Sequence, residues 1–238
     1  MKERNIDQVV RGTATMQMLG AVGWSLAGAV ILWAISGDAQ EKFSTGRWWE
    51  VVIPGLFGGL MVLFALSAFS DGWRRRGHPD EHPALKCPAY GTTAQVRHAL
   101  QEALNTSRKV CVVDVEVTDE WLLNVGRWEV RVIYLPMVAW YYKRVTEHKR
   151  YWVTTDVKYD FVLHTTDGQS FTRDDLSDAQ VDRLMELVSE RAPAAIGGYS
   201  EQAQSLWSND RAGFVKTVAE RRASLELEAR SHRTVCEP

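Results

Sequence analysis

The chain has 238 residues and a formal net charge of −2, and 45% of its residues are hydrophobic. This length suits one large domain, or a membrane part followed by a domain of ordinary size. Residues 77–238 hold 20 Lys and Arg against 24 Asp and Glu, a charge of −4, whereas a domain that binds nucleic-acid phosphates usually carries the opposite balance over one face. The composition therefore argues against a nucleic-acid-binding protein.

Two segments near the start of the sequence are long and apolar enough to cross a lipid bilayer. Residues 14–36 and 51–70 contain 23 and 20 residues without a single charge. A helix rises about 1.5 Å per residue, so roughly 20 apolar residues span a hydrocarbon core about 30 Å thick. The first segment is too long for the apolar part of a signal peptide, and a second segment follows it. We therefore predict two transmembrane helices, at 14–36 and 51–70, joined by a short external loop at 37–50.

The distribution of basic residues predicts which side of the membrane each part occupies. Basic residues near the ends of spans are retained on the cytoplasmic side. Two of them lie in the loop at 37–50, whereas seven flank the outer ends of the two spans, namely Lys2, Arg4, Arg11, Arg74, Arg75, Arg76 and Lys86. We therefore expect a multi-pass protein of the inner (plasma) membrane, with residues 1–13 and both termini in the cytoplasm.

The chain beyond the second span divides into a linker, a domain and a tail. Residues 71–91 contain three prolines and three glycines and are typical of a juxtamembrane linker. A helix begins after Thr92, which forms a capping-box pattern with Gln95. We predict a cytoplasmic domain at 92–195, followed by a further helix and a tail at 196–238.

Within this domain the hydrophobic pattern changes to strands. Between Lys109 and Phe171 the period is two, and β-branched and aromatic residues dominate. The dipeptide Asp167-Gly168 suits a tight hairpin turn, and Pro136 suggests a bulge or a sheet edge. We predict about seven short antiparallel strands, in the segments KVCVVDVEVT, EWLLNV, RWEVRVIYL, VAWYYKR, KRYWVTT, KYDFVLHTT and QSFTRD.

Two helices follow the strands. Ser177 and Gln180 form a second capping-box pattern, and an apolar stripe at helical spacing comes after it. Pro193 and two glycines end this helix. A last helix begins after Ser200 and is expected to continue to about Arg230.

The stretch WYYKRVTEHKRYW, residues 140–152, reads almost the same in both directions. If a hairpin turn centres on Thr146-Glu147, aromatic residues pair with aromatic residues and basic residues with basic residues. Aromatic pairs stabilise a sheet, whereas like charges placed opposite each other destabilise it by a few tenths of a kcal/mol. In this register Lys143 lies opposite Arg150, and Arg144 lies opposite Lys149.

We expect water, stacking on the neighbouring rings or a bound anion to relieve the repulsion among these four cations. Near an anionic bilayer each Lys or Arg contributes about 1 kcal/mol, and Arg74, Arg75 and Arg76 form a second basic cluster close to the membrane. The seven residues are therefore candidates for contact with an anionic lipid surface or an acidic partner protein. The alternative is a solvated hairpin tip beside ordinary topology signals.

Small residues recur every four positions in both predicted spans. They are Gly55 and Gly59 in the second span and Ala21, Ser25 and Ala29 in the first. Small residues let helices approach closely, which favours packing of the two spans on each other or of one chain on a second copy, as a homo-oligomer. Neither span has an ionisable residue in its interior, which argues against a proton path, an ion pore or a transport site.

The sequence contains none of the common catalytic or metal-binding motifs. It has no Gly-rich phosphate loop, no G-x-S-x-G, no H-E-x-x-H and no Cys–His pair at recognisable spacing. Cys87, Cys111 and Cys236 are widely spaced, which favours free thiols over disulfides or a zinc site. His78 and His82 lie beside prolines that oppose a metal-binding helical turn. We therefore expect no catalytic residue, no metal and no cofactor.

A run of about seven antiparallel strands followed by an amphipathic helix resembles a pleckstrin-homology-like (PH-like) barrel. The segment VTDEWLL…VIYLPMVAWYYKRV…YDFVLHTTDGQSF, residues 117–171, is similar to bacterial membrane proteins in which such a domain follows two membrane helices. The segment GGYSEQAQSLWSNDRAGFVKTVAERR, residues 197–222, resembles the region after that domain in an uncharacterised group of these proteins.

The resemblance implies an α+β fold class. A two-helix transmembrane hairpin would precede a cytoplasmic PH-like antiparallel β-barrel or sandwich of about seven strands, capped by a helix and followed by one further helix. Such domains usually bind lipids or proteins, although a shared fold does not establish a shared ligand. We thus expect a non-enzymatic scaffold or sensor that binds a protein or an anionic lipid surface. An immunity-type protein that protects the membrane against a toxin, and an enzyme with an unrecognised site, are the alternatives.

Overall fold

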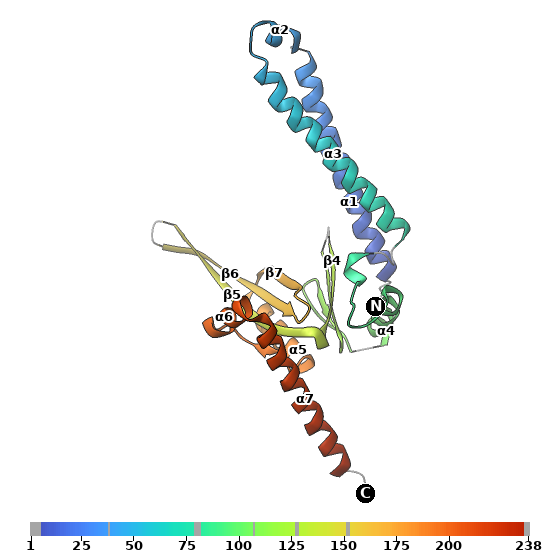
Figure 1. Ribbon diagram of the computed structural model, residues 1–238, viewed down its shortest axis with the longest axis vertical. Coiled ribbons are helices and arrows are strands. Elements are labelled where there is room, and N and C mark those ends of the chain that lie inside the picture. The colour runs from blue at the N-terminus through green and yellow to red at the C-terminus, as the bar shows by residue number, and fades with distance from the viewer. Residues whose placement is uncertain are drawn as a thin grey trace. The chain divides into compact units, whose positions relative to one another are not determined.

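The computed structural model describes residues 6–37, 39–78, 82–106, 108–126, 129–150 and 153–235 (Figure 1). The chain divides into two compact units. Residues up to 105, together with 124–131, form the first unit, and residues 106–123, together with those from 132 onward, form the second.

The first unit is built mainly from helices. Two of them, α1 and α3, contain the predicted spans and are long and apolar enough to cross a membrane. The predicted capping box is present, because the Thr92 N–H donates to Gln95 Oε1 at 2.8 Å and the Gln95 N–H donates to Thr92 Oγ1 at 3.4 Å. The helices are α1 (Ile6–Ser36), α2 (Ala39–Ser44), α3 (Trp49–Gly77), the 3-10 helix η2 (Pro83–Leu85) and α4 (Thr93–Thr106).

Helices α1 and α3 pack through small residues that recur every seven positions. A Cβ atom built on Gly28 would lie 2.9 Å from the Gly58 carbonyl oxygen, and one built on Gly72 would lie 3.2 Å from the Ala14 carbonyl oxygen. The helices are therefore antiparallel, with their backbones almost in contact. A seven-residue repeat stays on one face of two helices that wind around each other. We call these residues the small-residue seam: Ala14, Ala21 and Gly28 in α1, and Gly58, Ala65 and Gly72 in α3, all of them buried.

The seam does not follow the four-residue spacing on which the sequence prediction rested. No atom of α1 lies within 4 Å of a Cβ atom built on Gly55 or Gly59. Ala21 is in the seam, but Ser25 is only half-buried and Ala29 is exposed. Four residues advance a helix by about 40° more than one full turn, so a four-residue repeat soon leaves the contact face. The close contacts therefore lie at other glycines than those predicted.

Two four-stranded sheets, with strand orders β1-β2-β3-β4 and β7-β6-β5-β8, lie mainly in the second unit, although the end of β3 and the start of β4 belong to the first. The mixed α+β class is confirmed, but of the two predicted forms, a barrel or a sandwich, the closed barrel is not present, because the two sheets are not closed. Strand β8 was not predicted, and it pairs in parallel with β5 at Trp140 and Tyr141. The strands are β1 (Val110–Val112), β2 (Val115–Val117), β3 (Trp121–Val125), β4 (Val130–Tyr134), β5 (Val138–Arg150), β6 (Val153–Thr165), β7 (Ser170–Leu176) and β8 (Ile196–Gly197).

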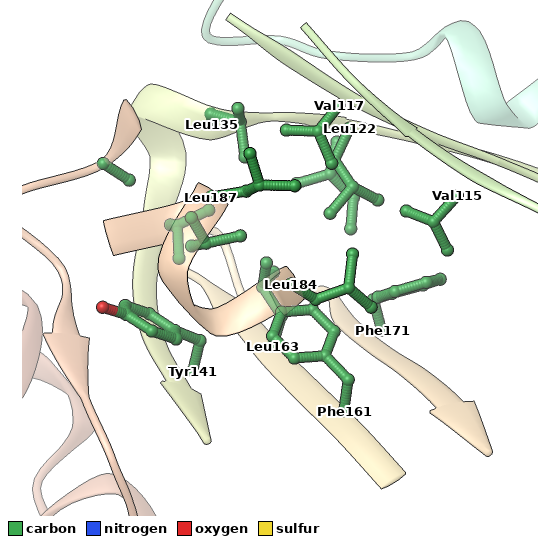
Figure 2. Close-up of a cluster of buried hydrophobic side chains, with 14 of the residues drawn as sticks. Val115, Val117, Leu122, Leu135, Tyr141, Phe161, Leu163, Phe171, Leu184 and Leu187 are labelled. Carbon is green, nitrogen blue, oxygen red and sulfur yellow. The ribbon is translucent and has the colours of Figure 1, made fainter. Parts of the chain in front are cut away.

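The main core of this unit lies between the sheets and helix α5 (Asp178–Arg191) (Figure 2). Helix α5 begins at the predicted capping box, where Ser177 and Gln180 exchange hydrogen bonds of 2.8 and 3.3 Å. Its apolar stripe supplies Leu184 and Leu187 to the core. Both sheets contribute buried side chains to it, including Val115, Val117, Leu122, Phe161, Leu163 and Phe171.

The region predicted as one last helix is two helices, α6 (Glu201–Asn209) and α7 (Arg211–Val235). Asp210 separates them, because its N–H donates to the Leu206 carbonyl at 2.8 Å and its carboxylate accepts the Gly213 N–H at 2.9 Å. Trp140 and Tyr142 of β5 pack against this helix pair, on the face of the sheet opposite to Tyr141. The second buried cluster comprises Ala139, Trp140, Tyr142, Val162, Ala203, Phe214 and Val218.

The seam generates a prediction about the stability of the helix pair. In Gly28→Ala the added methyl group would lie 2.9 Å from the Gly58 carbonyl oxygen, so the helices must separate, at an expected cost of about 1–3 kcal/mol. Thermal unfolding of the purified chain in detergent measures this loss. Gly59→Ala is the matched control, because it makes the same change of residue where no neighbour lies within 4 Å. Equal melting temperatures for the two variants would contradict the seam.

Candidate functional site

The stretch from Trp140 to Arg150 is part of one long strand, not a complete hairpin. Strand β5 runs to Arg150, where its partner is Val153 in β6, so Thr146 and Glu147 lie within the paired strand and not in a turn. The register predicted around Thr146-Glu147 is therefore wrong. Arg144 lies opposite Asp160, where Lys149 was expected.

The burial of β6 explains this register. Phe161 and Leu163 are completely buried, and they face the core together with Tyr141. A shift of one residue would turn both side chains out of the core. The symmetrical order of the letters in 140–152 says nothing about this burial, because the residues that fix the register come later in the sequence.

The paired strands β5 and β6 extend beyond the rest of their sheet. β7 pairs with β6 only between Tyr159 and His164, and β8 pairs with β5 only at Trp140 and Tyr141. Among the described residues, 145–150 and 153–158 thus have strand partners only in each other. Figure 1 shows this two-stranded extension, which we call the ribbon. Val145 and Val157 within it are 52% and 38% exposed.

Lys143 stands at the base of the ribbon and is paired with carboxylates of α5. Its ammonium group contacts Asp178 and lies 2.8 Å from Asp182, one turn further along the helix. Hydrogen bonds with Asp178 and then Asp182 raise the pKa of Lys143 above its usual value. The ammonium also lies 5.3 Å from the centre of the Tyr159 ring.

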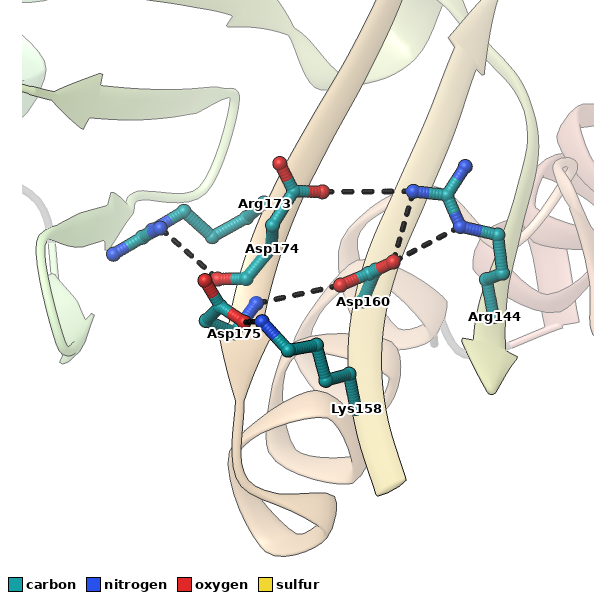
Figure 3. A network of polar contacts seen from close by, with 6 residues as sticks. All are labelled: Arg144, Lys158, Asp160, Arg173, Asp174 and Asp175. Carbon is teal, nitrogen blue, oxygen red and sulfur yellow. Dashed lines mark hydrogen bonds and ion pairs between the residues drawn. The ribbon is translucent and has the colours of Figure 1, made fainter. Parts of the chain in front are cut away.

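Arg144 is held on the opposite face of the strand. Its Nε and one terminal nitrogen lie 2.9 and 2.8 Å from the same oxygen of Asp160, and Asp174 lies 3.5 Å away (Figure 3). Asp160 is buried, so its charge needs these donors. Its other oxygen accepts the Asp175 N–H at 3.3 Å. Arg144 thus stabilises a buried carboxylate.

The cations predicted to bind an anion consequently fall into different environments. Lys143 and Arg144 are neutralised by carboxylates that the sequence prediction did not consider. Asp160 comes from β6, whereas Asp174, Asp178 and Asp182 come from RDDLSDAQVD, an acidic run at the end of β7 and the start of α5. Lys149 and Arg150 end β5, and their side chains lie outside the described part of the chain.

The second predicted cluster, Arg74, Arg75 and Arg76, forms the last turn of α3. Cations at this end of a helix interact favourably with its dipole. Arg75 differs from its two neighbours in being half-buried, and it donates to the Gln17 side-chain oxygen of α1 at 3.3 Å.

An aromatic cluster at the start of the strand pair was not predicted as a unit. The His164 ring lies 5.3 Å from the Trp140 ring and 5.1 Å from the Trp207 ring, and Arg211 lies over Trp207 at 5.0 Å. Burial, and then the positive charge of Arg211, lowers the pKa of His164 below its usual value. The cluster therefore joins α6 and α7 to the sheet through a neutral imidazole.

The cysteines and histidines for which the sequence predicts neither a zinc site nor catalysis lie partly within the described residues. Cys87 and Cys111 are not part of a disulfide, whereas Cys236 lies outside the described part. His82 is buried, and its Nδ1 accepts the Ala84 N–H at 3.2 Å. In the described ranges, no group of three or more His, Cys, Asp and Glu side chains could hold a metal ion.

The Arg144 contacts predict an unequal effect of two neighbouring substitutions. Arg144→Gln leaves the buried Asp160 carboxylate short of donors, which should lower the free energy of unfolding by about 1–3 kcal/mol. Lys143→Gln breaks more exposed pairs and should cost at most about 1 kcal/mol. Urea unfolding followed by circular dichroism measures both. A double variant with Asp160→Asn should recover part of the loss in Arg144→Gln, and no recovery would contradict the assigned pair.

His164 predicts a pH dependence of the docking of α6 and α7. Because the folded pKa lies below the unfolded value of 6.5, the unfolded state takes up the proton first as the pH falls. The contribution of the neutral His164 ring to stability is therefore fully present above pH 6.5 and decreases below it. Hydrogen-exchange protection of α6, corrected for intrinsic rates, should fall in this range. His164→Phe should abolish the change, whereas His98→Phe, at an exposed position, should keep it.

No protein-family model matches the sequence, and neither a curated protein nor a solved structure is significantly similar to it. The PH-like resemblance therefore stays a prediction, and the candidate site is defined by its geometry alone.

Proposed function

We propose that this chain is a non-enzymatic inner-membrane protein that anchors a PH-like binding domain in the cytoplasm. In this proposal α1 and α3 span the bilayer, and both termini are cytoplasmic. The apolar length of the two helices supports the anchor, and the basic residues at their outer ends support the orientation. Strands β1 to β7 followed by α5 are in the order expected for a PH-like domain.

The ribbon is the observation that carries the binding function. Its two strands project beyond β7 and β8, so their outer edges offer backbone N–H and C=O groups to another chain. An isolated two-stranded ribbon is only marginally stable in water, and none of its described side chains between 145 and 158 is part of a buried cluster. The core does not require this length of strand, which leaves recognition as its role.

We propose a protein segment in extended conformation as the partner. Such a segment would add a strand to an edge of the ribbon through main-chain hydrogen bonds, and side chains would supply specificity. The pairing of Lys143 and Arg144 with internal carboxylates favours a protein over a lipid surface, because two of the predicted cations already have carboxylate partners and would have to leave them to bind phosphates.

An anionic lipid surface is the second candidate partner. It is favoured by the position of Lys149 and Arg150 at the end of β5, next in the sequence to Tyr151 and Trp152. Each basic residue near such a surface contributes about 1 kcal/mol, and aromatic rings prefer the membrane interface.

Photocrosslinking of the full-length chain in native membranes tests both partners with one probe. A benzophenone amino acid replaces Val145 or Val157, whose exposed side chains lie on the ribbon. The same residue at Leu227 in α7, which is 66% exposed, is the control. We expect one discrete protein adduct from both ribbon positions and none from the control.

Protein adducts and lipid adducts are distinguished by their mass. Adducts of single lipid molecules at the ribbon positions would favour the second candidate. Equal crosslinking from the ribbon and from Leu227 would contradict a binding role for the ribbon.

A further inference from the structure

A groove of about 410 Å³ lies along one side of the α1–α3 pair. The groove is present because its floor consists of small residues next to and within the seam, namely Gly20, Ala21, Ala65 and Ala68. The large rings of Trp24 and Phe64 flank one end, and they are 60% and 78% exposed. The groove therefore has an apolar floor and apolar walls.

The other end of the groove is polar. Gln17, Asp71 and Arg75 line it. In the described part of the chain Arg75 bonds to Gln17 across the helix pair, so the guanidinium is held at the groove with further N–H groups available. Asp71 places a carboxylate one helical turn from this cation.

The spacing of the two ends fits the depth profile of a bilayer. Asp71 is the first residue after the predicted span at 51–70, so the polar end lies at headgroup depth. Trp24 is seven residues from Gln17, which is about 10 Å along a helix, so the aromatic end lies within the hydrocarbon. A ligand that matches this groove is polar at one end and apolar over the next two helical turns.

We propose that the groove binds one phospholipid with an ammonium-bearing headgroup, such as phosphatidylethanolamine. Its phosphate accepts hydrogen bonds from Arg75, whose planar fork suits phosphate oxygens. Its ammonium pairs with Asp71, and one acyl chain lies over Ala68 and Gly20 between the two rings. The opposite charges of Asp71 and Arg75 favour a zwitterionic headgroup over an anionic one. This inference rests on the proposal that α1 and α3 span the membrane.

Native mass spectrometry of the full-length chain in detergent tests the site. The delipidated protein is titrated with phosphatidylethanolamine and, separately, with phosphatidylglycerol of the same acyl chains. We expect phosphatidylethanolamine to bind about tenfold more tightly, as loss of one charge-assisted pair would produce. Equal binding, or tighter binding of phosphatidylglycerol, would overturn the proposal.

Two pairs of matched variants locate the bound lipid. Arg75→Gln should weaken phosphatidylethanolamine binding about tenfold, whereas Arg76→Gln, in the same helical turn but outside the groove, should not. Ala68→Leu fills the groove and should also prevent binding, whereas Ser67→Leu adds the same volume on an exposed face. Wild-type affinity in both Arg75→Gln and Ala68→Leu would refute the groove. Arg75→Gln keeps the test decisive if Ala68→Leu does not fold.

Carbonate extraction separates failure of this inference from failure of the proposed function. If the chain leaves the membrane in carbonate, the membrane anchor is wrong and the groove is wrong with it. If the chain stays in the membrane but binds lipid without regard to Arg75 and Ala68, only the groove is wrong.

Discussion

The register between β5 and β6 is the constraint on which the second unit depends. Because alternate residues of a strand face opposite sides, one register places Tyr141, Phe161 and Leu163 in the core and Trp140 and Tyr142 against α6 and α7. The same register brings Arg144 to Asp160. Packing on both faces and a buried ion pair therefore depend on a single alignment, and no neighbouring alignment satisfies all three.

The first unit depends on the close packing of α1 against α3. Its helices meet at small residues, where main-chain atoms of one helix approach main-chain and side-chain atoms of the other, and most of the large apolar residues of the two helices remain exposed. Leu, Phe and Trp exposed on α1 and α3 would be a liability in water, but they are suited to a hydrocarbon surround. The same small residues leave room for the groove beside the seam. The close packing of the two helices and the groove therefore have the same cause.

Features that depend on local sequence could be predicted from it. The apolar lengths of the two long helices and the capping boxes at Thr92 and Ser177 are of this kind, because each is set by a few adjacent residues. The features that failed depend on distant partners. The turn at Thr146-Glu147 was inferred from symmetry within 140–152, whereas the pairing is decided by residues up to Leu163. The aspartates that neutralise Lys143 and Arg144 are also remote in sequence. The seam was missed because a four-residue repeat was sought where the helices use a seven-residue one.

The ion pairs at the base of the ribbon divide β5 and β6 into two parts. The two parts differ in how many substitutions they tolerate. Before Lys143, and after Asp160, nearly every residue is tied to the core, the aromatic cluster or a buried carboxylate. Beyond that boundary, the described side chains between Arg144 and Val157 on β5 and β6 are exposed. Substitutions there alter exposed surface without touching the packing that folds the domain. The sequence of the ribbon can therefore change in evolution while the core stays as it is.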